Sequence, residues 1–199
     1  WGALRDGDAV RFQVWAPVCK AAWLLPGDAP PVPMQPDGDG GFHVRHTCPP
    51  GTRYRYRLGE RDVPDPASRW QPDGVDGPSA VLDPAGHVWR HDAWRGRPWN
   101  EVVLYELHVG SCGGYAGVQR QLPALAAMGI TAIELMPVAQ CPGTRNWGYD
   151  GVLPYAPAAA YGHPDALKAL VDAAHGLGIQ VFLDVVYNHF GPDGNYLSA

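Results

Sequence analysis

Hydrophobic and polar residues alternate in short runs through the first part of the chain. Four such runs, at 10–15, 21–25, 41–45 and 54–58, are separated by Gly, Pro and Asp. Alternation with a period of two at this spacing predicts the strands of an antiparallel β-sandwich. In residues 54–58 the two Tyr and the Leu should share the buried face, while the two Arg point to water.

The pattern changes after residue 100. Continuous apolar runs at 102–109, 131–138 and 179–186 predict three strands, and residues 118–128 and 164–177 carry apolar side chains at helical spacing. The order strand, helix, strand, helix, strand is typical of a parallel α/β fold.

The stretch 64–78 holds too many Pro and Gly residues for a regular element. We expect an ordered, extended connector packed by Trp70. Taken together, the patterns divide the chain into a β-sandwich at 1–85, a connector at 86–100 and an α/β unit at 101–199.

Charge and aromatic content narrow the class of partner. The chain has 15 Lys and Arg against 20 Asp and Glu, a net charge of -5, so it has no broad basic face for nucleic acid or anionic lipid. A neutral partner fits better. Eight Trp and nine Tyr offer flat faces for sugar rings, although packing in a β-rich core explains many aromatics equally well.

The four cysteines, Cys19, Cys48, Cys112 and Cys141, lack the paired short spacing of a zinc site. We interpret them as free thiols in a reducing compartment, which predicts a cytoplasmic protein. No apolar run approaches the roughly 20 residues of a bilayer span, and the first residues lack the basic and apolar regions of a signal peptide.

Candidate chemistry follows the ends of the predicted strands, because ligands of parallel α/β folds collect there. The first strand ends near His108, the second leads into the loop 145–151, and the third ends with Asp184, Asn188 and His189. The third group brings an acceptor, an amide and an imidazole to one rim. A structural pair or a cap remains an alternative for such a spacing.

The loop 146–151 places Trp147 and Tyr149 beside glycines that allow close approach of the backbone. Such a loop suits the floor of a site for a ring-shaped ligand. The alternative is a hydrophobic plug that closes one end of a barrel.

Other chemistries are poorly supported. The chain has no GxSxG elbow, no Walker loop, no GxGxxG after a strand and no HExxH. His43 and His46 fit the exposed surface of a strand better than a metal site. We expect neither a metal nor a cofactor.

The residues 184–189, Asp-Val-Val-Tyr-Asn-His, resemble the first conserved region of the α-amylase superfamily of glycoside hydrolases. Segments similar to that superfamily surround it in the expected order, at 104–110, 129–137 and 146–151. Within the superfamily, 64–75, 145–152 and 187–197 most resemble the malto-oligosyltrehalose trehalohydrolases. Those enzymes hydrolyse the α-1,4 bond next to the trehalose end of their substrate and release trehalose.

The resemblance implies a fold and a substrate site. The fold is an immunoglobulin-like β-sandwich of the carbohydrate-binding type, followed by the first β/α units of a TIM (β/α)8 barrel, truncated after strand three. Tyr149 would stack under the sugar at the cleavage subsite, His189 would hydrogen-bond it, Asp184 would orient an arginine from strand four, and Asn188 would hold the loop. The substrate-binding residues implied in this way are Trp147, Tyr149, Asp150, Asp184, Asn188 and His189.

The chain departs from the superfamily at the catalytic groups. A retaining glycosidase needs two carboxyl groups, which the superfamily supplies from strands four and five. None of Asp150, Asp184 and Asp193 matches them, so no catalytic residue is assigned, and we expect the nucleophile Asp and the acid/base Glu downstream of Ala199. We expect a longer enzyme of roughly 550 to 600 residues, because three strands alone would expose a parallel edge and an apolar inner face and would be poorly soluble or unstable. Without the two carboxyl groups we expect the chain alone to be inactive.

The segment 110–117 is shorter than the usual loop after strand one, which leaves the shape of that side of the cleft open. Several functions also remain open. An isoamylase-type debranching enzyme or a glucan branching enzyme would use the same elements on another α-glucan, although the chain lacks the Trp-Val-Pro-Ala-His motif of the branching enzymes. A non-catalytic glucan-binding protein would bind saturably, lose affinity on Trp147→Ala or Tyr149→Ala, and form no product.

Overall fold

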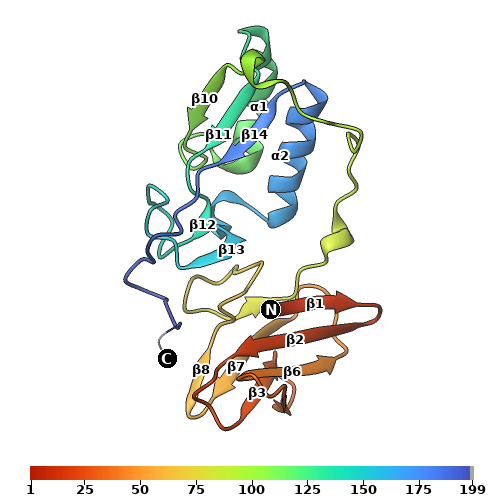
Figure 1. The fold of residues 1–199 in the computed structure, drawn as a ribbon, viewed down its shortest axis with the longest axis vertical. Coiled ribbons are helices and arrows are strands. Elements are labelled where there is room, and N and C mark those ends of the chain that lie inside the picture. Colours follow the sequence, from red (N-terminus) through yellow and green to blue (C-terminus); the bar gives the residue numbers. More distant parts are fainter. Residues whose placement is uncertain (198–199) are drawn as a thin grey trace.

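The computed structural model describes residues 1–197, so the last two residues of the predicted unit 101–199 lie outside the described part. Figure 1 shows two antiparallel sheets at one end of an elongated molecule and a parallel sheet with two helices at the other. An extended stretch of chain without long elements runs along the side and joins them.

Two antiparallel sheets form the first part. One has the strand order β1-β2-β6-β5, with bounds β1 Gly2–Asp6, β2 Ala9–Trp15, β5 Gln35–Pro36 and β6 Gly41–His46. The other has the order β4-β3-β7-β8, with bounds β3 Ala22–Pro26, β4 Val32–Pro33, β7 Arg53–Leu58 and β8 Arg61–Val63, and β9 (Ser79–Ala80) also pairs with β7. The four predicted strands are confirmed as β2, β3, β6 and β7.

The two sheets enclose one core. Phe12 from β2 and Tyr54 and Tyr56 from β7 are fully buried in it, and the ring of Tyr54 packs edge-on against Phe12 at 4.9 Å. On the other face of β7, the side chain of Arg57 pairs with Asp62 at 2.7 Å and remains half exposed. The predicted alternation along β7 is therefore confirmed.

Residues 64–78 contain no helix or strand, as predicted, but they are ordered by buried polar groups. The hydroxyl of Tyr54 donates to Asp65 Oδ2 at 2.6 Å, and Ser79 Oγ donates to Gln71 Oε1 at 2.8 Å. The Asp65 backbone N–H donates to Ser79 Oγ at 3.0 Å, and the side chains of Asp65, Gln71 and Ser79 are fully buried. Trp70 packs edge-on against the ring of His163 at 4.4 Å.

The joining stretch carries two short 3-10 helices, η1 (Pro84–Gly86) and η2 (Trp99–Glu101). The buried carboxylate of Asp172 holds its middle, since it accepts from the backbone N–H and the Nε of Arg90 at 3.0 and 2.9 Å and from the backbone N–H of His91 at 3.0 Å. Burial alone would raise the pKa of Asp172, but these hydrogen bonds lower it. The carboxylate therefore stays charged and paired.

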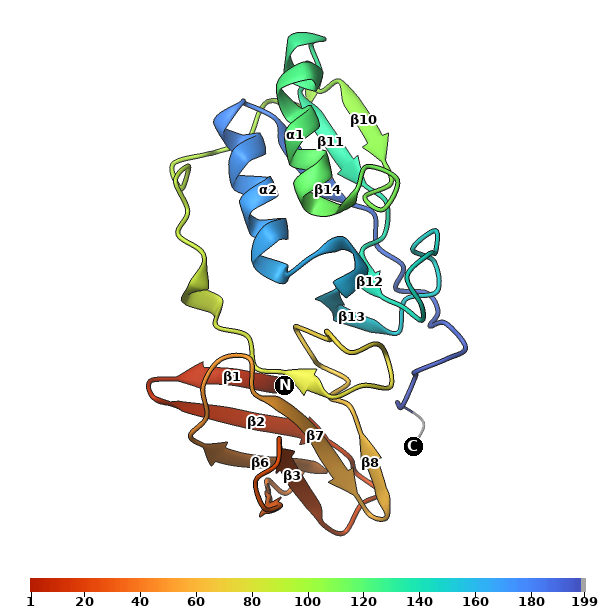
Figure 2. The same ribbon diagram turned by 180° about the vertical axis from the view of Figure 1, so that it is seen from behind.

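The parallel sheet has the order β10-β11-β14, with bounds β10 Leu104–Leu107, β11 Ala132–Leu135 and β14 Gln180–Leu183. Helices α1 (Gly114–Ala127) and α2 (Pro164–Gly176) cover one face of this sheet, as Figure 2 shows. The core between them buries Val118, Leu122, Ile133 and Leu170 completely. The predicted order of strands and helices is confirmed.

Two details differ from the prediction. The apolar runs predicted buried strands, but Leu104 and Tyr105 of β10 are exposed and Leu183 of β14 is 49% exposed. Both strands lie at the edges of the sheet, and the helices cover one face only, so the other face of these strands is open. Helix α1 also begins four residues before the predicted 118, because Tyr115 extends its buried face while the glycines before it suggested a loop.

Between β11 and α2 the chain forms elements that the sequence did not predict. They are the antiparallel pair β12 (Ala139–Gln140) and β13 (Leu153–Pro157) and the 3-10 helix η3 (Ala159–Tyr161). Within residues 1–197, neither helix combines the length and the hydrophobicity required to span a bilayer.

Candidate functional site

The carboxyl ends of the three parallel strands meet at the end of the sheet that faces the β12–β13 pair (Figure 1). His108 follows β10, and Asp184 follows β14 and stays in register through a backbone hydrogen bond to Leu135 at 3.0 Å. The loop between β12 and β13 carries Trp147 and Tyr149 over this end. The topology thus brings together the three places that the sequence marked.

Tyr149 and Asp184 are in direct contact. The Tyr149 hydroxyl donates to Asp184 Oδ2 at 3.2 Å, and the side chain of Tyr149 is 41% exposed, which leaves part of its ring open to solvent. Partial desolvation and the hydrogen bond to Asp184 raise the pKa of Tyr149. The hydroxyl therefore remains a donor at neutral pH, and its position fixes the ring.

His189 is held at both ring nitrogens. Its Nε2 lies 2.9 Å from the backbone oxygen of Tyr149, and its Nδ1 lies 2.9 Å from Asn188 Nδ2. These partners assign the hydrogen to Nε2, which donates to the carbonyl, while Nδ1 accepts from the amide. Asn188, His189, Tyr149 and Asp184 therefore form one continuous set of contacts.

The loop that carries Tyr149 is fixed from below. Asn146 Oδ1 accepts from the backbone N–H of Gly148 at 2.6 Å, and His108 Nε2 donates to the Asn146 carbonyl at 2.8 Å. The Ser111 N–H donates to His108 Nδ1 at 3.0 Å and fixes that tautomer. Gly148 has φ 93° and lies so close to the Pro137 carbonyl that no Cβ fits. This position requires glycine.

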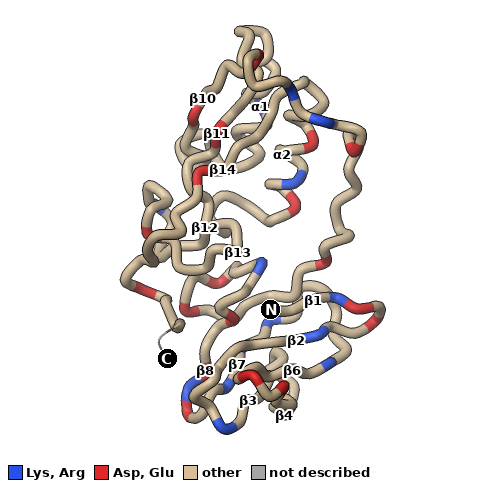
Figure 3. Tube along the Cα trace, viewed as in Figure 1, with Lys and Arg blue, Asp and Glu red and all other residues tan. Residues whose placement is uncertain are grey.

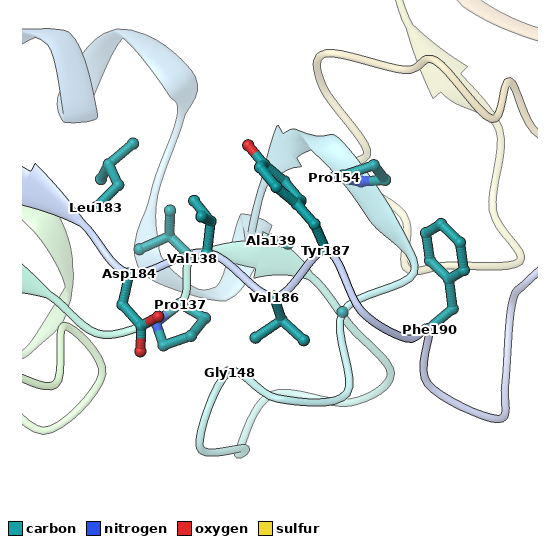
Figure 4. Close-up of a pocket in the computed structure, with 12 residues that line it drawn as sticks. Pro137, Val138, Ala139, Gly148, Pro154, Leu183, Asp184, Val186, Tyr187 and Phe190 are labelled. Carbon is teal, nitrogen blue, oxygen red and sulfur yellow. The ribbon is translucent and has the colours of Figure 1, made fainter.

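Two cavities flank the contact set. One, of about 100 Å³, is lined by Pro137, Gly148, Asp184 and Phe190 among others. In Figure 4 the Asp184 carboxylate and Val186 point to the side of Gly148, whereas Tyr187 points the other way. The other cavity, of about 420 Å³, lies on the His108 side and is lined by Trp147, Arg145, Asn146 and Tyr161.

The structure therefore separates the sequence-predicted residues into groups. Tyr149, Asp184, Asn188 and His189 come together. Trp147 is 72% exposed and faces the larger cavity, edge-on to the His108 ring at 5.8 Å. The side chain of Asp150 is exposed and forms no hydrogen bond within the described residues.

His43 and His46, which the sequence placed on the exposed surface of a strand, lie on β6 in the antiparallel part, as expected of a strand, but both are half buried rather than exposed. Among residues 1–197, no group of three or more His, Cys, Asp and Glu side chains is arranged to hold a metal ion.

Sequence reasoning missed two carboxylates beside the site. Glu106 of β10 and Glu134 of β11 are directly paired in register, and both contribute to the raised pKa of Tyr149. Figure 3 shows acidic positions on the strands of this sheet. The signal was available, because a Glu-Leu pair occurs at the same register in two consecutive apolar runs.

Comparison with known proteins agrees with this architecture. The model of the alpha amylase catalytic domain matches residues 69–198, which include the parallel sheet and the described contact set. The chain belongs to the alpha amylase family. Residues 184–189, which resemble the first conserved region of the superfamily, lie inside the part that the family model matches.

Individual relatives extend this family assignment. The malto-oligosyltrehalose trehalohydrolase of Deinococcus radiodurans is 44% identical over 98% of the chain. A 1,4-alpha-glucan branching enzyme of Vibrio cholerae is 36% identical over 98% of the chain. A crystal structure from Salmonella typhimurium that carries a provisional alpha amylase name superposes on the whole chain with a TM-score of 0.96 and 48% identity.

The chain spans about a third of the length of these relatives. It covers 33% of the Deinococcus protein, 30% of the Vibrio protein and 35% of the Salmonella chain. The family assignment therefore rests on the part of the relatives that this chain matches.

Proposed function

We propose that the chain is part of a glycoside hydrolase that cleaves the α-1,4-glucosidic bond next to the trehalose end of malto-oligosyltrehalose and releases trehalose. The observation that carries this proposal is the contact set of Tyr149, Asp184 and His189 in a chain 44% identical to a protein named for that activity. The lower identity to a branching enzyme, 36%, supports the same choice.

The geometry supports a role for each member of the set. The open part of the Tyr149 ring suits stacking under a sugar, whose axial C–H groups are apolar. A sugar hydroxyl can replace the exposed Asn188 amide and donate to His189 Nδ1, while Nε2 keeps its bond to the loop. We assign Asp184 to the orientation of an arginine outside this chain, and Trp147 and Asp150 to further contacts with the substrate.

The catalytic carboxyl groups are not assigned to this chain. Retaining hydrolysis needs two of them about 5 Å apart on either side of the bond, and the only described partner of the Asp184 side chain is Tyr149. We propose that the nucleophile and the acid/base come from the strands that follow in the longer relatives. The proposed chemistry requires no cofactor.

We further propose that residues 1–85 form an immunoglobulin-like β-sandwich, 86–100 a connector, and 101–199 the first units of a (β/α)8 barrel. The shared core of the two antiparallel sheets supports the first of these. The sequential parallel order β10-β11-β14, with both helices on one face, supports the last. The exposed Leu183 would be covered inside a complete barrel.

The test is trehalose release from malto-oligosyltrehalose by the full-length protein. His189→Ala should lower kcat/KM by about tenfold to a hundredfold, the effect of losing one substrate hydrogen bond and the loop contact. His43→Ala, on β6 in the antiparallel part, is the matched control and should retain activity. Unchanged kcat/KM in a folded His189→Ala variant would contradict the role of His189.

The products distinguish the other candidate functions. Linear chains released from a branched glucan would indicate a debranching enzyme, and new branches would indicate a branching enzyme. Saturable glucan binding without any product would indicate a binding protein. Each of these results, without trehalose release, would refute the proposed activity.

A further inference from the structure

The chain that follows His189 is anchored to the loop that carries Tyr149. The Gly191 N–H donates to the Gly151 carbonyl at 3.2 Å. Gly191 is buried against the backbone of Asp150, where no Cβ fits. The position of His189 is therefore coupled to its own downstream segment, 190–197, which contains no helix or strand.

Segment 190–197 is also anchored to residues 64–78, the extended stretch that precedes β9. Gly194 lies against the side chain of Val75, again without room for a Cβ. The hydroxyl of Tyr196 donates to Asp76 Oδ1 at 2.6 Å, and the Tyr196 ring packs against the core of the antiparallel sheets. Within the described residues, this is the one side-chain hydrogen bond between 190–197 and the first 100 residues.

Asp76 itself is held by the antiparallel part. Its backbone carbonyl accepts from the guanidinium of Arg55 on β7. The next carbonyl, that of Gly77, accepts from the buried Gln71 side chain at 2.7 Å. The Asp76 carboxylate is thus presented to Tyr196 by a fixed backbone, and its own side chain is left for that one bond.

The bond has the character of a charge-assisted hydrogen bond, which is shorter and stronger than a neutral one. The hydrogen bond to Asp76 and partial desolvation raise the pKa of Tyr196, so the hydroxyl remains a donor through neutral pH. A segment without helix or strand depends on such side-chain bonds for its order.

We infer that Tyr196 and Asp76 are positioning residues: they hold the segment after His189 so that His189 and Asn188 are ready for the sugar before it binds. This inference rests on the proposed function. Without the bond the segment samples other positions, and the substrate binds only the fraction of molecules in which the site is formed. The antiparallel part thereby contributes to substrate affinity without touching the substrate.

The inference predicts a specific division between KM and kcat in the full-length protein. Tyr196→Phe and Asp76→Ala should each raise KM for malto-oligosyltrehalose by about three- to tenfold, because the competent fraction falls by that factor. The value of kcat should stay within about twofold, because saturating substrate restores the formed site. The double variant should equal either single variant, since both remove the same bond.

Two controls separate positioning from general damage. Asp76→Asn keeps an oxygen that can accept from Tyr196 and should retain nearly the original KM. Tyr155→Phe removes a hydroxyl from a tyrosine on β13 that is 64% exposed and should change neither constant. A fall in kcat at unchanged KM would signify loss of folded enzyme and would overturn the inference, as would an unchanged KM in both disruptive variants.

Hydrogen exchange keeps this inference distinct from the proposed function. Amides in 187–197 should exchange about three- to tenfold faster in Tyr196→Phe and Asp76→Ala than in the unaltered protein and in Asp76→Asn. If the unaltered protein releases no trehalose, the proposed function fails, and the exchange rates alone decide the inference. Equal rates in all variants would overturn it.

Discussion

The buried carboxyl group of Asp65 should make the antiparallel part less stable as the pH rises. Burial raises the pKa of Asp65 from 3.8 to about 6, against the opposing hydrogen bonds from the Tyr54 hydroxyl and the Ala67 N–H. Between these two values the folded protein keeps a proton that the unfolded chain has released. Stability therefore falls as the pH rises through this window and stays reduced above it.

The magnitude follows from the two pKa values. Their difference corresponds to about 3 kcal/mol at 1.36 kcal/mol per pH unit. Asp65→Asn carries no charge at any pH in this range, so this contribution disappears in the variant. The free energy of opening of the variant, relative to that of the unaltered protein, should therefore increase by about 2 kcal/mol between about pH 4 and about pH 7, because a small part of the change falls outside this range.

The assay is hydrogen exchange of the β7 amides, corrected for the pH dependence of intrinsic exchange, because it reports opening of this part of the molecule. Asp8→Asn is the matched control: it makes the same chemical change at an exposed turn between β1 and β2. A difference for Asp65→Asn that is the same at both pH values would refute the reasoning, and so would an equal pH dependence in the control.

Three further substitutions test the supports of the fold and the site. Gly143→Ala should lower the free energy of unfolding by about 1–2 kcal/mol, because Gly143 has a positive φ of 71° in open space. Gly148→Ala should lower it further and loosen the site loop, because its Cβ also meets the Pro137 carbonyl. Chemical denaturation compares the two variants, and equal losses of stability would contradict the close approach of Gly148 to Pro137. Asp172→Ala should lower the melting temperature and expose the chain at Arg90 to trypsin, because the joining stretch loses its anchor; unchanged cleavage would refute that role.

Strong periodic patterns made most of the fold predictable. The alternation in β7 and the helical spacing in α2 each follow from one local rule, namely which face meets a core. The pair β12–β13 was missed because it is short and Pro154 and Pro157 lie in it. Proline at such positions usually argues against a strand, and tertiary packing overrides that preference here.

The hydrogen-bond partners of buried polar side chains could not be predicted from the sequence. The segment 64–78 has the composition of a surface loop, yet Asp65 and Gln71 are fully buried. Their partners, Tyr54 and Ser79, lie 11 and 8 residues away along the chain, and no local sequence pattern predicts such pairs.

At the candidate site the strand-end rule identified where Tyr149, Asp184 and His189 lie, because topology alone gathers strand ends. It could not foresee that both ring nitrogens of His189 bind the protein itself, since that depends on side-chain rotamers.

The spatial order β10-β11-β14 is also the order in which these strands leave the ribosome. Each new strand of this sheet pairs with the strand of the same sheet that precedes it in the chain, after an intervening helix has formed. The sheet can therefore grow by the addition of strands at one edge during translation. The unpaired edge strand, rather than a completed core, is then the surface of the nascent chain that chaperones would bind.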